Sequence, residues 1–331
     1  MSRLQSAFVT GAGGFIGQNL VRQLVSEKVS VVALMLPGES IPNEWRETVK
    51  VVIGDVRQLR TMSKEIGKVD AIFHLAAVVS DWGAQQTHID ITVNGTEQAI
   101  DLAKKWGAHF IVTTSVCAYA SELANGLLTE SSATGEPSSP YEFCKQEQER
   151  VTLEAVNNFK LKATIIRPGN VYGVGSGPWV NTLVEMMKQG KPCRIGSGEW
   201  DAGLVHVKNL VTLLISAARS NFTDGDIFIG SDGLGITWKT YLDRLSAATG
   251  APKPKSIPNI IARNIAPVLE WIGHFIKQKQ RPLITRQSYR LVGGSNEFST
   301  QKSQKLLGYK PVVSFEEAME ELAAHFTSQN A

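Results

Sequence analysis

Apolar residues occur in short runs, separated by longer segments with helical periodicity, through the first half of the chain. The runs are rich in β-branched residues and lack strict alternation, which is typical of strands buried on both faces of a parallel sheet. Strands that alternate with helices predict an α/β fold with a doubly wound parallel sheet. The predicted strands are Ser6–Thr10, Val29–Leu34, Val49–Ile53, Ala71–Leu75, Phe110–Thr114 and Ala163–Ile166, and the clearest helices are Ile16–Ser26, Thr92–Trp106 and Tyr141–Asn158.

The second half of the chain has a less regular pattern. It predicts one more strand, Asp226–Gly230, and four helices, one of which stops at Gly250. The Pro/Lys-rich stretch Ala251–Pro258 is typical of a turn or linker. The four helices are Asn181–Gln189, Val207–Ala217, Thr237–Thr249 and about Ser314–Phe326.

Apolar residues also recur near helical spacing between Ile260 and Ile276. The favoured interpretation is an ordinary helix stripe that faces the core. The alternative is a helix that caps an apolar pocket or rests on a lipid surface, aided by Lys277, Lys279 and Arg281. The apolar positions are Ile261, Ile265, Val268, Leu269, Ile272, Phe275 and Ile276.

The composition is that of an ordinary globular protein. Of 331 residues, 43% are hydrophobic and 20% charged, and the formal net charge of +3 comes without a Lys/Arg-rich run, so nucleic acid is not an expected partner. The three cysteines and the histidines lack metal-type spacing, so no metal is expected. Neither a signal peptide nor a membrane-spanning segment is expected, which favours a cytoplasmic protein.

A glycine-rich turn follows the first predicted strand and opens the first helix. Gly11, Gly14 and Gly17 have the spacing G-x-x-G-x-x-G. Glycine lets the backbone turn tightly and approach a pyrophosphate, and the helix N-terminus offers free N–H groups with a partial positive charge. Gly17 allows the helix to pack closely on the strand. Strand, turn and helix together favour a dinucleotide over a ligand-free turn.

Two other strand ends support a dinucleotide. Asp55, followed by Val56, ends the third strand and is placed to accept a hydrogen bond from an adenine amino group, although a turn role is an alternative. Leu75, Ala76 and Ala77 end the fourth strand and leave room for a cofactor. The second strand ends Leu34-Met35-Leu36-Pro37, with neither the acid that holds a ribose 2′-hydroxyl nor an arginine for a 2′-phosphate. The choice between NAD and NADP therefore stays open.

Tyr141 and Lys145 lie four residues apart at the start of a predicted helix, and hence on one face of it. A tyrosine has an ordinary pKa near ~10, and a lysine ammonium nearby favours the phenolate, so we expect the pKa of Tyr141 to be lowered toward neutrality. Ser115 follows the strand Phe110–Thr114, at the sheet edge where α/β ligands bind. Its hydroxyl is placed to orient a substrate oxygen that Tyr141 protonates or deprotonates.

The ordered set of motifs resembles the extended short-chain dehydrogenase/reductases, of the NAD-dependent epimerase/dehydratase superfamily, over essentially the whole chain. That resemblance implies a Rossmann-type nucleotide-binding domain of residues 1–172 plus about 203–231, with a substrate domain of about 173–202 plus 232–331. It also implies hydride transfer at the nicotinamide, with Tyr141 as acid/base and Lys145 on the ribose hydroxyls. The matching stretches are TGAGGFIG, GDVR (Gly54–Arg57), DAIFHLAA (Asp70–Ala77), VNGT (Val93–Thr96), TTSVCAY (Thr113–Tyr119), YEFCK, RPGNVYG (Arg167–Gly173), VHVKNL (Val205–Leu210) and LGYKP (Leu307–Pro311).

Cofactor-binding positions follow from the same resemblance. Besides the three turn glycines, Tyr141 and Lys145, they are Gly13, Phe15, Ile16, Asp55, Val56, Leu75, Ala76, Ala77, Asn94, Thr113, Pro168, Asn170 and Val171. The resemblance further implies a homodimer that pairs through helices such as Thr92–Trp106 and Tyr141–Asn158.

Two branches of this family compete. Sugar-nucleotide epimerases and dehydratases commonly carry an arginine before the VHV-type segment, where this chain has Ala202-Gly203-Leu204; Arg194 is the nearest substitute. The 3β-hydroxysteroid-dehydrogenase-like branch acts on apolar secondary alcohols or ketones and is the better match at Lys208-Asn209-Leu210. A non-catalytic dinucleotide sensor is a third alternative. The expected substrate residues are Val79, Asp81, Trp82, Ser115, Val116, Asn170 and Trp179.

Overall fold

A seven-stranded parallel sheet forms the centre of the computed structural model, which describes residues 4–330. Its strand order is β11-β7-β5-β4-β1-β2-β3, and every neighbouring pair is parallel. The order reverses direction between β1 and β4, as in a doubly wound fold. The predicted fold class is therefore confirmed. These strands are β1 (Ser6–Thr10), β2 (Ser30–Met35), β3 (Val49–Ile53), β4 (Ala71–His74), β5 (His109–Thr113), β7 (Ala163–Pro168) and β11 (Asp224–Gly230).

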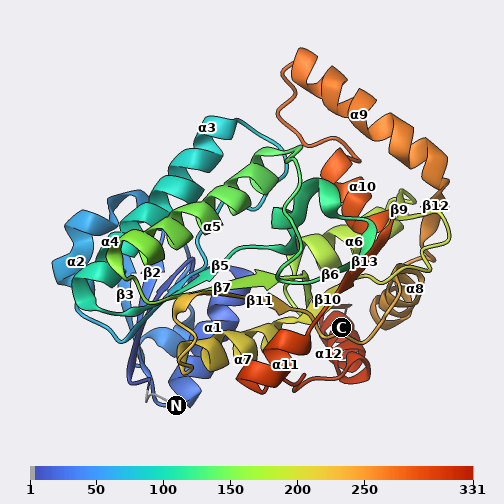
Figure 1. Cartoon of the computed structure of the whole chain (residues 1–331). Helices are drawn as coiled ribbons and strands as arrows, with labels where there is room; N and C mark the ends of the chain where they lie inside the picture. Colours follow the sequence, from blue (N-terminus) through green and yellow to red (C-terminus); the bar gives the residue numbers. More distant parts are fainter. Residues whose placement is uncertain (1–3, 331) are drawn as a thin grey trace.

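Helices cover both faces of the sheet (Figure 1). On one face, α1 (Phe15–Ser26), α7 (Val207–Ala218) and α11 (Gln301–Leu307) contribute to a core with β1. On the other, α2 (Leu59–Ile66), α4 (Asn94–Trp106) and α5 (Pro140–Phe159) pack against the opposite side of the same strands. Strands covered on both faces need the continuous apolar runs that the sequence contains.

A third core lies outside the sheet. It joins α6 (Thr182–Lys188), α8 (Trp238–Thr249) and α12 (Phe315–Asn330) through large side chains such as Trp238 and Tyr241. Three two-stranded parallel sheets border this part: β10 with β8, β12 with β9, and β13 with β6. They are formed by β6 (Asn125–Leu128), β8 (Asn170–Tyr172), β9 (Pro192–Ile195), β10 (Leu204–His206), β12 (Lys255–Ile257) and β13 (Ser295–Phe298).

Three segments differ in secondary structure from the expectations based on the sequence. The stretch 251–258, expected as a turn, contains β12, which pairs with β9. Two short helices, α3 (Gln85–His88) and α10 (Arg286–Val292), lie where the sequence pattern predicted no element. Such short elements have too few residues for a periodic pattern, and they depend on tertiary partners.

The helix α9 (Asn259–Phe275) contradicts the expectation of a core-facing stripe. Its buried face consists of Ala262, Ala266, Glu270 and Gly273, whereas the large apolar side chains point to solvent. The physical reason is close approach, since small residues let the helix lie against Trp82, whose ring would be 2.9 Å from a Cβ at Gly273. Within the described residues, no helix is long and apolar enough to cross a bilayer.

Candidate active site

The carboxyl ends of the central strands bring the predicted site residues to one edge of the sheet. Because β1, β4, β5 and β7 are parallel neighbours, the segments that follow Thr10, His74, Thr113 and Pro168 emerge side by side. This edge carries the glycine turn after β1, Leu75–Ala77 after β4, Ser115 and Val116 after β5, and Asn170 and Val171 after β7. Asn94 begins α4 and is exposed.

The glycine turn is tightly packed at two of its glycines. Gly11 has a φ of +66°, and a Cβ there would lie 2.9 Å from the backbone nitrogen of Ala76. A Cβ on Gly17 would lie 2.2 Å from the carbonyl oxygen of Gly11. Gly14 is the N-cap of α1 and supplies no side chain to the free N–H groups of the first helical turn. The turn thus presents bare backbone at a helix N-terminus, which suits a phosphate group.

Glu39 is a candidate cofactor contact that the sequence pattern did not identify. Its carboxylate accepts a hydrogen bond from the backbone N–H of Leu36 over 2.9 Å, and a Cβ on Gly13 would lie 2.7 Å from Oε2 of Glu39. A carboxylate therefore lies beside the glycine turn, although the end of the second strand itself carries no acidic residue. The signal was missed because Glu39 lies four residues beyond the end of β2 and reaches back through the turn at Pro37 and Gly38.

The side chain of Asp55 is used within a turn of the protein and is not free to contact a ligand. Its carboxylate caps the short 3-10 helix Val56–Gln58 and accepts hydrogen bonds from the N–H and the guanidinium of Arg57 over 2.8–2.9 Å. The hydrogen bonds from Arg57 hold the pKa of Asp55 below its ordinary value. An adenine contact would have to share an acceptor that Arg57 already uses.

Tyr141, Ser115 and Lys145 form the centre of the site. Tyr141 lies in the first turn of α5, and the Nζ atom of Lys145 is 5.6 Å from the centre of its ring. The Ser115 hydroxyl accepts a hydrogen bond from the N–H of Cys117 over 3.0 Å. Lys145 is buried and donates to the carbonyl oxygen of Thr113 over 3.2 Å. The structure therefore brings the three predicted catalytic residues together.

The prediction that the pKa of Tyr141 is lowered toward neutrality is wrong for the protein without a bound cofactor. Burial raises the pKa of Tyr141 above its ordinary value, and a hydrogen bond with Ser115 offsets only part of that effect. Burial also lowers the pKa of Lys145 to about 8. Desolvation disfavours the charged form of each group, and at this separation the lysine charge does not outweigh it.

Lys145 has a second hydrogen-bond acceptor that the sequence analysis missed. Its Nζ atom donates to Oε1 of Gln148 over 2.7 Å, and Nε2 of Gln148 donates to the hydroxyl of Thr96 over 2.8 Å. The Thr96 hydroxyl also lies 3.0 Å from Nε2 of His74. These side chains are all buried. The spacing of three residues between Lys145 and Gln148 on α5 was a usable signal, because it places them on one helix face.

A buried ion pair joins α5 to β7 behind the site. The guanidinium of Arg167 binds the carboxylate of Glu149 through contacts of 2.6 and 2.8 Å, and the Thr114 hydroxyl donates to the same carboxylate over 2.8 Å. Both charged side chains are less than one-tenth exposed. Glu149 therefore fixes the helix that carries Tyr141 against the strand end that carries Ser115.

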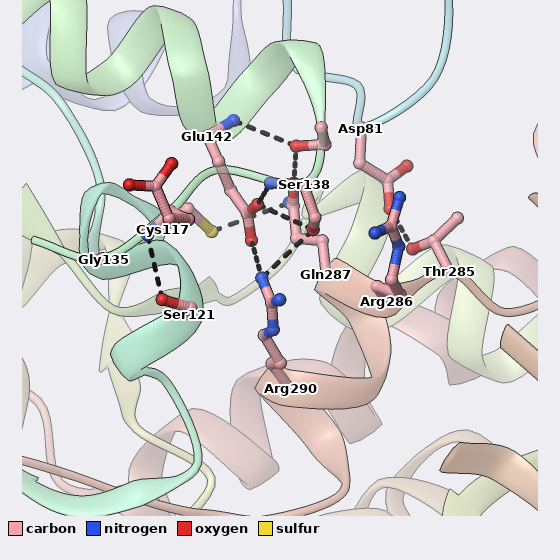
Figure 2. Close-up of polar contacts among 12 residues, drawn as sticks. Asp81, Cys117, Ser121, Gly135, Ser138, Glu142, Thr285, Arg286, Gln287 and Arg290 are labelled. Atoms are coloured by element: carbon pink, nitrogen blue, oxygen red, sulfur yellow. Dashed lines mark hydrogen bonds and ion pairs between the residues drawn. The ribbon is translucent and has the colours of Figure 1, made fainter. Parts of the chain in front are cut away.

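Side chains of helix α10 point toward the first turn of α5, as Figure 2 shows for Gln287 and Arg290. Gln287 donates to Sγ of Cys117 over 3.7 Å and accepts from Ser139 over 2.5 Å. Arg290 lies 3.5 Å from the fully buried carboxylate of Glu142. Burial raises the pKa of that carboxyl. The far C-terminal part of the chain thus contacts the residues next to Ser115 and Tyr141.

The expected substrate residues have different surroundings. Val116 is buried, and Trp179 is partly buried beside the cluster that includes Tyr141. The carboxylate of Asp81 accepts a hydrogen bond from the hydroxyl of Thr285 (Figure 2). It also binds the guanidinium of Arg281. Val79 is exposed. The indole of Trp82 stacks on His274 and donates to the carbonyl of Gln278. The amide of Asn170 donates to the carbonyl of Ala202.

Comparisons with known proteins agree with this arrangement. The chain is 27% identical over 325 residues to a 2-alkyl-3-oxoalkanoate reductase of Stenotrophomonas maltophilia (strain K279a), covering 96% of this chain and 98% of that protein. It is 26% identical over 341 residues to the decarboxylating sterol-4-alpha-carboxylate 3-dehydrogenase of Mus musculus, covering 98% and 92%.

A solved structure shares the fold. The UDP-glucuronic acid 4-epimerase of Bacillus cereus, in complex with NAD, has a TM-score of 0.76 to this chain at 19% sequence identity and covers 99% of this chain and 100% of that one. A family model for the NAD dependent epimerase/dehydratase family matches residues 7–230. The chain therefore belongs to the NAD dependent epimerase/dehydratase family, whose members are enzymes of the extended short-chain dehydrogenase/reductase type.

Proposed function

We propose that this enzyme interconverts an apolar secondary alcohol and its ketone with NAD, using Tyr141 as the acid/base. The observation that carries the proposal is the convergence of Tyr141, Ser115 and Lys145 beside the glycine turn at one edge of the sheet. Ligands of doubly wound sheets bind at this edge, near the reversal of strand order.

The residues at the edge fit a nicotinamide dinucleotide. The bare backbone of Gly11–Gly17 suits the pyrophosphate. Lys145, which donates to the carbonyl of Thr113 at the end of β5, would hold the ribose hydroxyls. Among the described residues the buried hydroxyl of Thr113 has no hydrogen-bond partner, so the site retains an unused polar group next to Lys145. When bound, NAD supplies or accepts a hydride at its nicotinamide ring.

In the reductive direction, the carbonyl carbon of the substrate gains a hydride and its oxygen gains a proton from the Tyr141 hydroxyl. Ser115 donates a hydrogen bond to the same oxygen and orients it. Because burial raises the pKa of Tyr141, the phenol stays protonated at neutral pH, which suits a general acid. Oxidation requires the phenolate, which is favoured by added positive charge close to the ring.

An apolar substrate is supported by the side chains around Tyr141. Val116, Leu291 and Trp179 belong to or pack on the same apolar cluster. Arg194, the substitute for a phosphate clamp, instead lies 3.8 Å from Asp243 on α8. We propose that the part built on the third core contributes the remaining substrate contacts, and that two copies pair through α4 and α5.

The test is a substrate panel with purified enzyme. It contains long-chain β-keto acids and 3-ketosteroids, for which NADH oxidation is followed by absorbance. It also contains UDP-sugars with NAD, for which the sugar products are analysed, because an epimerase or dehydratase returns the hydride and leaves no net change in NADH. We expect turnover of one of the two apolar classes. Tyr141→Phe should lower kcat at least a thousandfold and leave NADH affinity within about threefold, because the lost hydroxyl acts on the substrate oxygen. Loss of NADH binding with unchanged chemistry in this variant contradicts the assignment.

A sugar-nucleotide epimerase or dehydratase is the second candidate, supported by the shared fold of the Bacillus cereus epimerase. Calorimetry with UDP separates the two, since an epimerase must bind the nucleotide and the apolar reductase must not. Failure of every substrate on the panel, with NADH bound, favours the third alternative of a non-catalytic sensor.

A further inference from the structure

The helix α9 exposes its large apolar side chains to solvent. Trp271 is 67% exposed and Phe275 is 75% exposed, and Ile260, Ile261, Ile265, Val268, Ile272 and Ile276 are exposed as well. In Figure 1, α9 lies at the periphery of the molecule, away from the central sheet. A contiguous apolar surface of this kind marks an interaction site in a protein that is otherwise folded.

An ordinary amphipathic helix buries its large apolar residues, whereas α9 buries small residues and exposes the large ones. Ala262 and Ala266 are fully buried against the body, although they have little hydrophobic area to bury. The apolar residues with the largest areas recur three or four positions apart on the side that faces away. Packing on the rest of the chain therefore explains the small residues of α9 and leaves its large ones without a partner within the described residues.

The segment that contains α9 is rich in basic residues, although Arg281, Arg286 and Arg290 pair with Asp81, Glu270 and Glu142. Residues 251–292 contain eight lysines or arginines and one acidic residue, Glu270. The whole chain has 34 basic and 31 acidic residues, so the other 289 residues carry 26 and 30, a net charge of −4. Glu270 is buried and paired with Arg286, whereas Lys277 and Lys279 at the end of the helix are exposed.

We propose that the exposed face of α9 inserts into the interfacial layer of an anionic lipid bilayer. Apolar residues with Trp and Phe on one face, and lysines at its border, are the features of helices that lie in a membrane interface. The lysines would contact lipid phosphates, which attract basic segments next to a membrane. A second copy of this chain is a poor occupant, because pairing through α9 would place the exposed Lys277 and Lys279 of both copies at the border of one apolar contact.

The proposed membrane face is connected to the active site. Glu270 on α9 accepts a hydrogen bond from the N–H of Arg286, the first residue of α10, over 2.7 Å. Tyr289 on α10 donates to Asn259 at the start of α9 over 2.8 Å. Because α10 also contacts Cys117 and Ser139, a bilayer on α9 would lie one helix away from Ser115 and Tyr141. The inference concerns an outer face and holds whichever reaction the site performs.

The experiment measures sedimentation of the full chain with vesicles of phosphatidylcholine, with and without phosphatidylglycerol. We expect binding that is at least tenfold stronger with phosphatidylglycerol and that weakens as salt is raised. Phe275→Ser combined with Trp271→Ser should weaken binding at least tenfold. Lys277→Gln with Lys279→Gln should remove most of the preference for phosphatidylglycerol. Melting temperature and NADH affinity should stay near wild type, because these side chains are exposed.

Phe159→Ser is the matched control. Phe159 is 61% exposed and ends α5, whose N-terminal turn carries Tyr141, so it lies far from α9's contacts with α10. This variant should bind vesicles like the wild type. The proposal is overturned if the wild type does not bind anionic vesicles, or if Phe159→Ser loses as much binding as the α9 variants. A wild-type dimer that the α9 variants convert to a monomer, without vesicle binding, assigns the face to a second copy instead.

Discussion

The ammonium of Lys145 donates a hydrogen bond to Oε1 of Gln148 over 2.7 Å, entirely within the protein. This contact begins a chain of buried polar groups from Lys145 to the strand end next to the glycine turn. Gln148 donates to Thr96, whose hydroxyl donates to the carbonyl of Thr92 over 2.6 Å. Since the Thr96 hydroxyl has one hydrogen, Nε2 of His74 must donate to it.

The other end of the chain follows from that assignment. Nδ1 of His74 then accepts from the hydroxyl of Thr10, 2.9 Å away. This is a neutral imidazole, in agreement with the burial that lowers the pKa of His74 to about 3. The network holds Lys145 by oriented dipoles, and among residues 4–330 no carboxylate is within hydrogen-bond distance of its ammonium. Gln148 is therefore a positioning residue for Lys145.

Substitution of Gln148 should move the pH dependence of turnover in a direction set by the new side chain. Gln148→Leu removes an acceptor from the ammonium, so the pKa of Lys145 should fall below about 8 and the alkaline limb of the kcat profile should shift to lower pH. Gln148→Glu adds a negative charge and should shift that limb to higher pH. We expect kcat of the leucine variant to fall about tenfold at pH 7, or roughly 1.4 kcal/mol.

The two variants control for each other, since both remove the Nε2 donor to Thr96 and only glutamate places a negative charge beside Lys145. The profiles are measured with the ketone identified by the panel. Equal shifts in one direction would show that Gln148 acts only through packing.

The ion pair of Glu149 and Arg167 should dominate the stability of the α5–β7 contact. Glu149→Met or Arg167→Met alone leaves one buried charge without a partner and should lower the free energy of unfolding by about 3–5 kcal/mol. The double variant should lose much less than the sum of the two single variants. Urea unfolding of the wild type, the two single variants and the double variant gives the coupling free energy between Glu149 and Arg167. If the losses in the free energy of unfolding are additive, the two side chains do not interact directly.

The sequence predicted the elements whose residues are determined by local pattern. The six early strands and the helix of Tyr141 and Lys145 have continuous apolar runs or clear periodicity. Their observed bounds differ from the expected ones by at most two residues at either end. The glycine turn was found because glycine spacing between strand and helix has a direct geometric cause. The convergence of Ser115 with Tyr141 followed from the parallel order of the strands.

Features set by tertiary contacts escaped prediction. Glu39 returns to Gly13 through a turn, so its distance along the sequence from β2 hid its position in space. The role of α10 depends on contacts between residues more than 140 positions apart, such as Ser139 with Gln287. For α9, periodicity identified the apolar face correctly but not its direction, because the pattern does not say whether the core or the solvent lies beside it.

Glu39 should make the enzyme prefer NADH to NADPH. A carboxylate beside Gly13 can accept hydrogen bonds from the ribose hydroxyls and repels a 2′-phosphate. We expect Glu39→Ser to reduce the ratio of kcat/KM for NADH over NADPH at least tenfold, mainly through KM. Glu44→Ser is the control, since Glu44 is an exposed acid paired with Arg22 and has no contact with the turn. An unchanged ratio in Glu39→Ser would place the ribose elsewhere.

Substitutions in the glycine turn should separate folding from cofactor binding. Alanine at Gly17 would place its Cβ 2.2 Å from the backbone oxygen of Gly11, so α1 must move off β1 and the free energy of unfolding should fall by about 1–3 kcal/mol.

Alanine at Gly14 meets only the Gly11 oxygen at 3.3 Å, and Gly14 has an ordinary φ of −73°. Gly14→Ala should therefore fold with near-wild-type stability, while its methyl group occupies space at the N-terminus of α1. We expect NADH affinity, measured by fluorescence, to fall at least tenfold in Gly14→Ala at an unchanged melting temperature. Normal NADH binding by a stable Gly14→Ala protein would mean that the pyrophosphate does not lie over this turn.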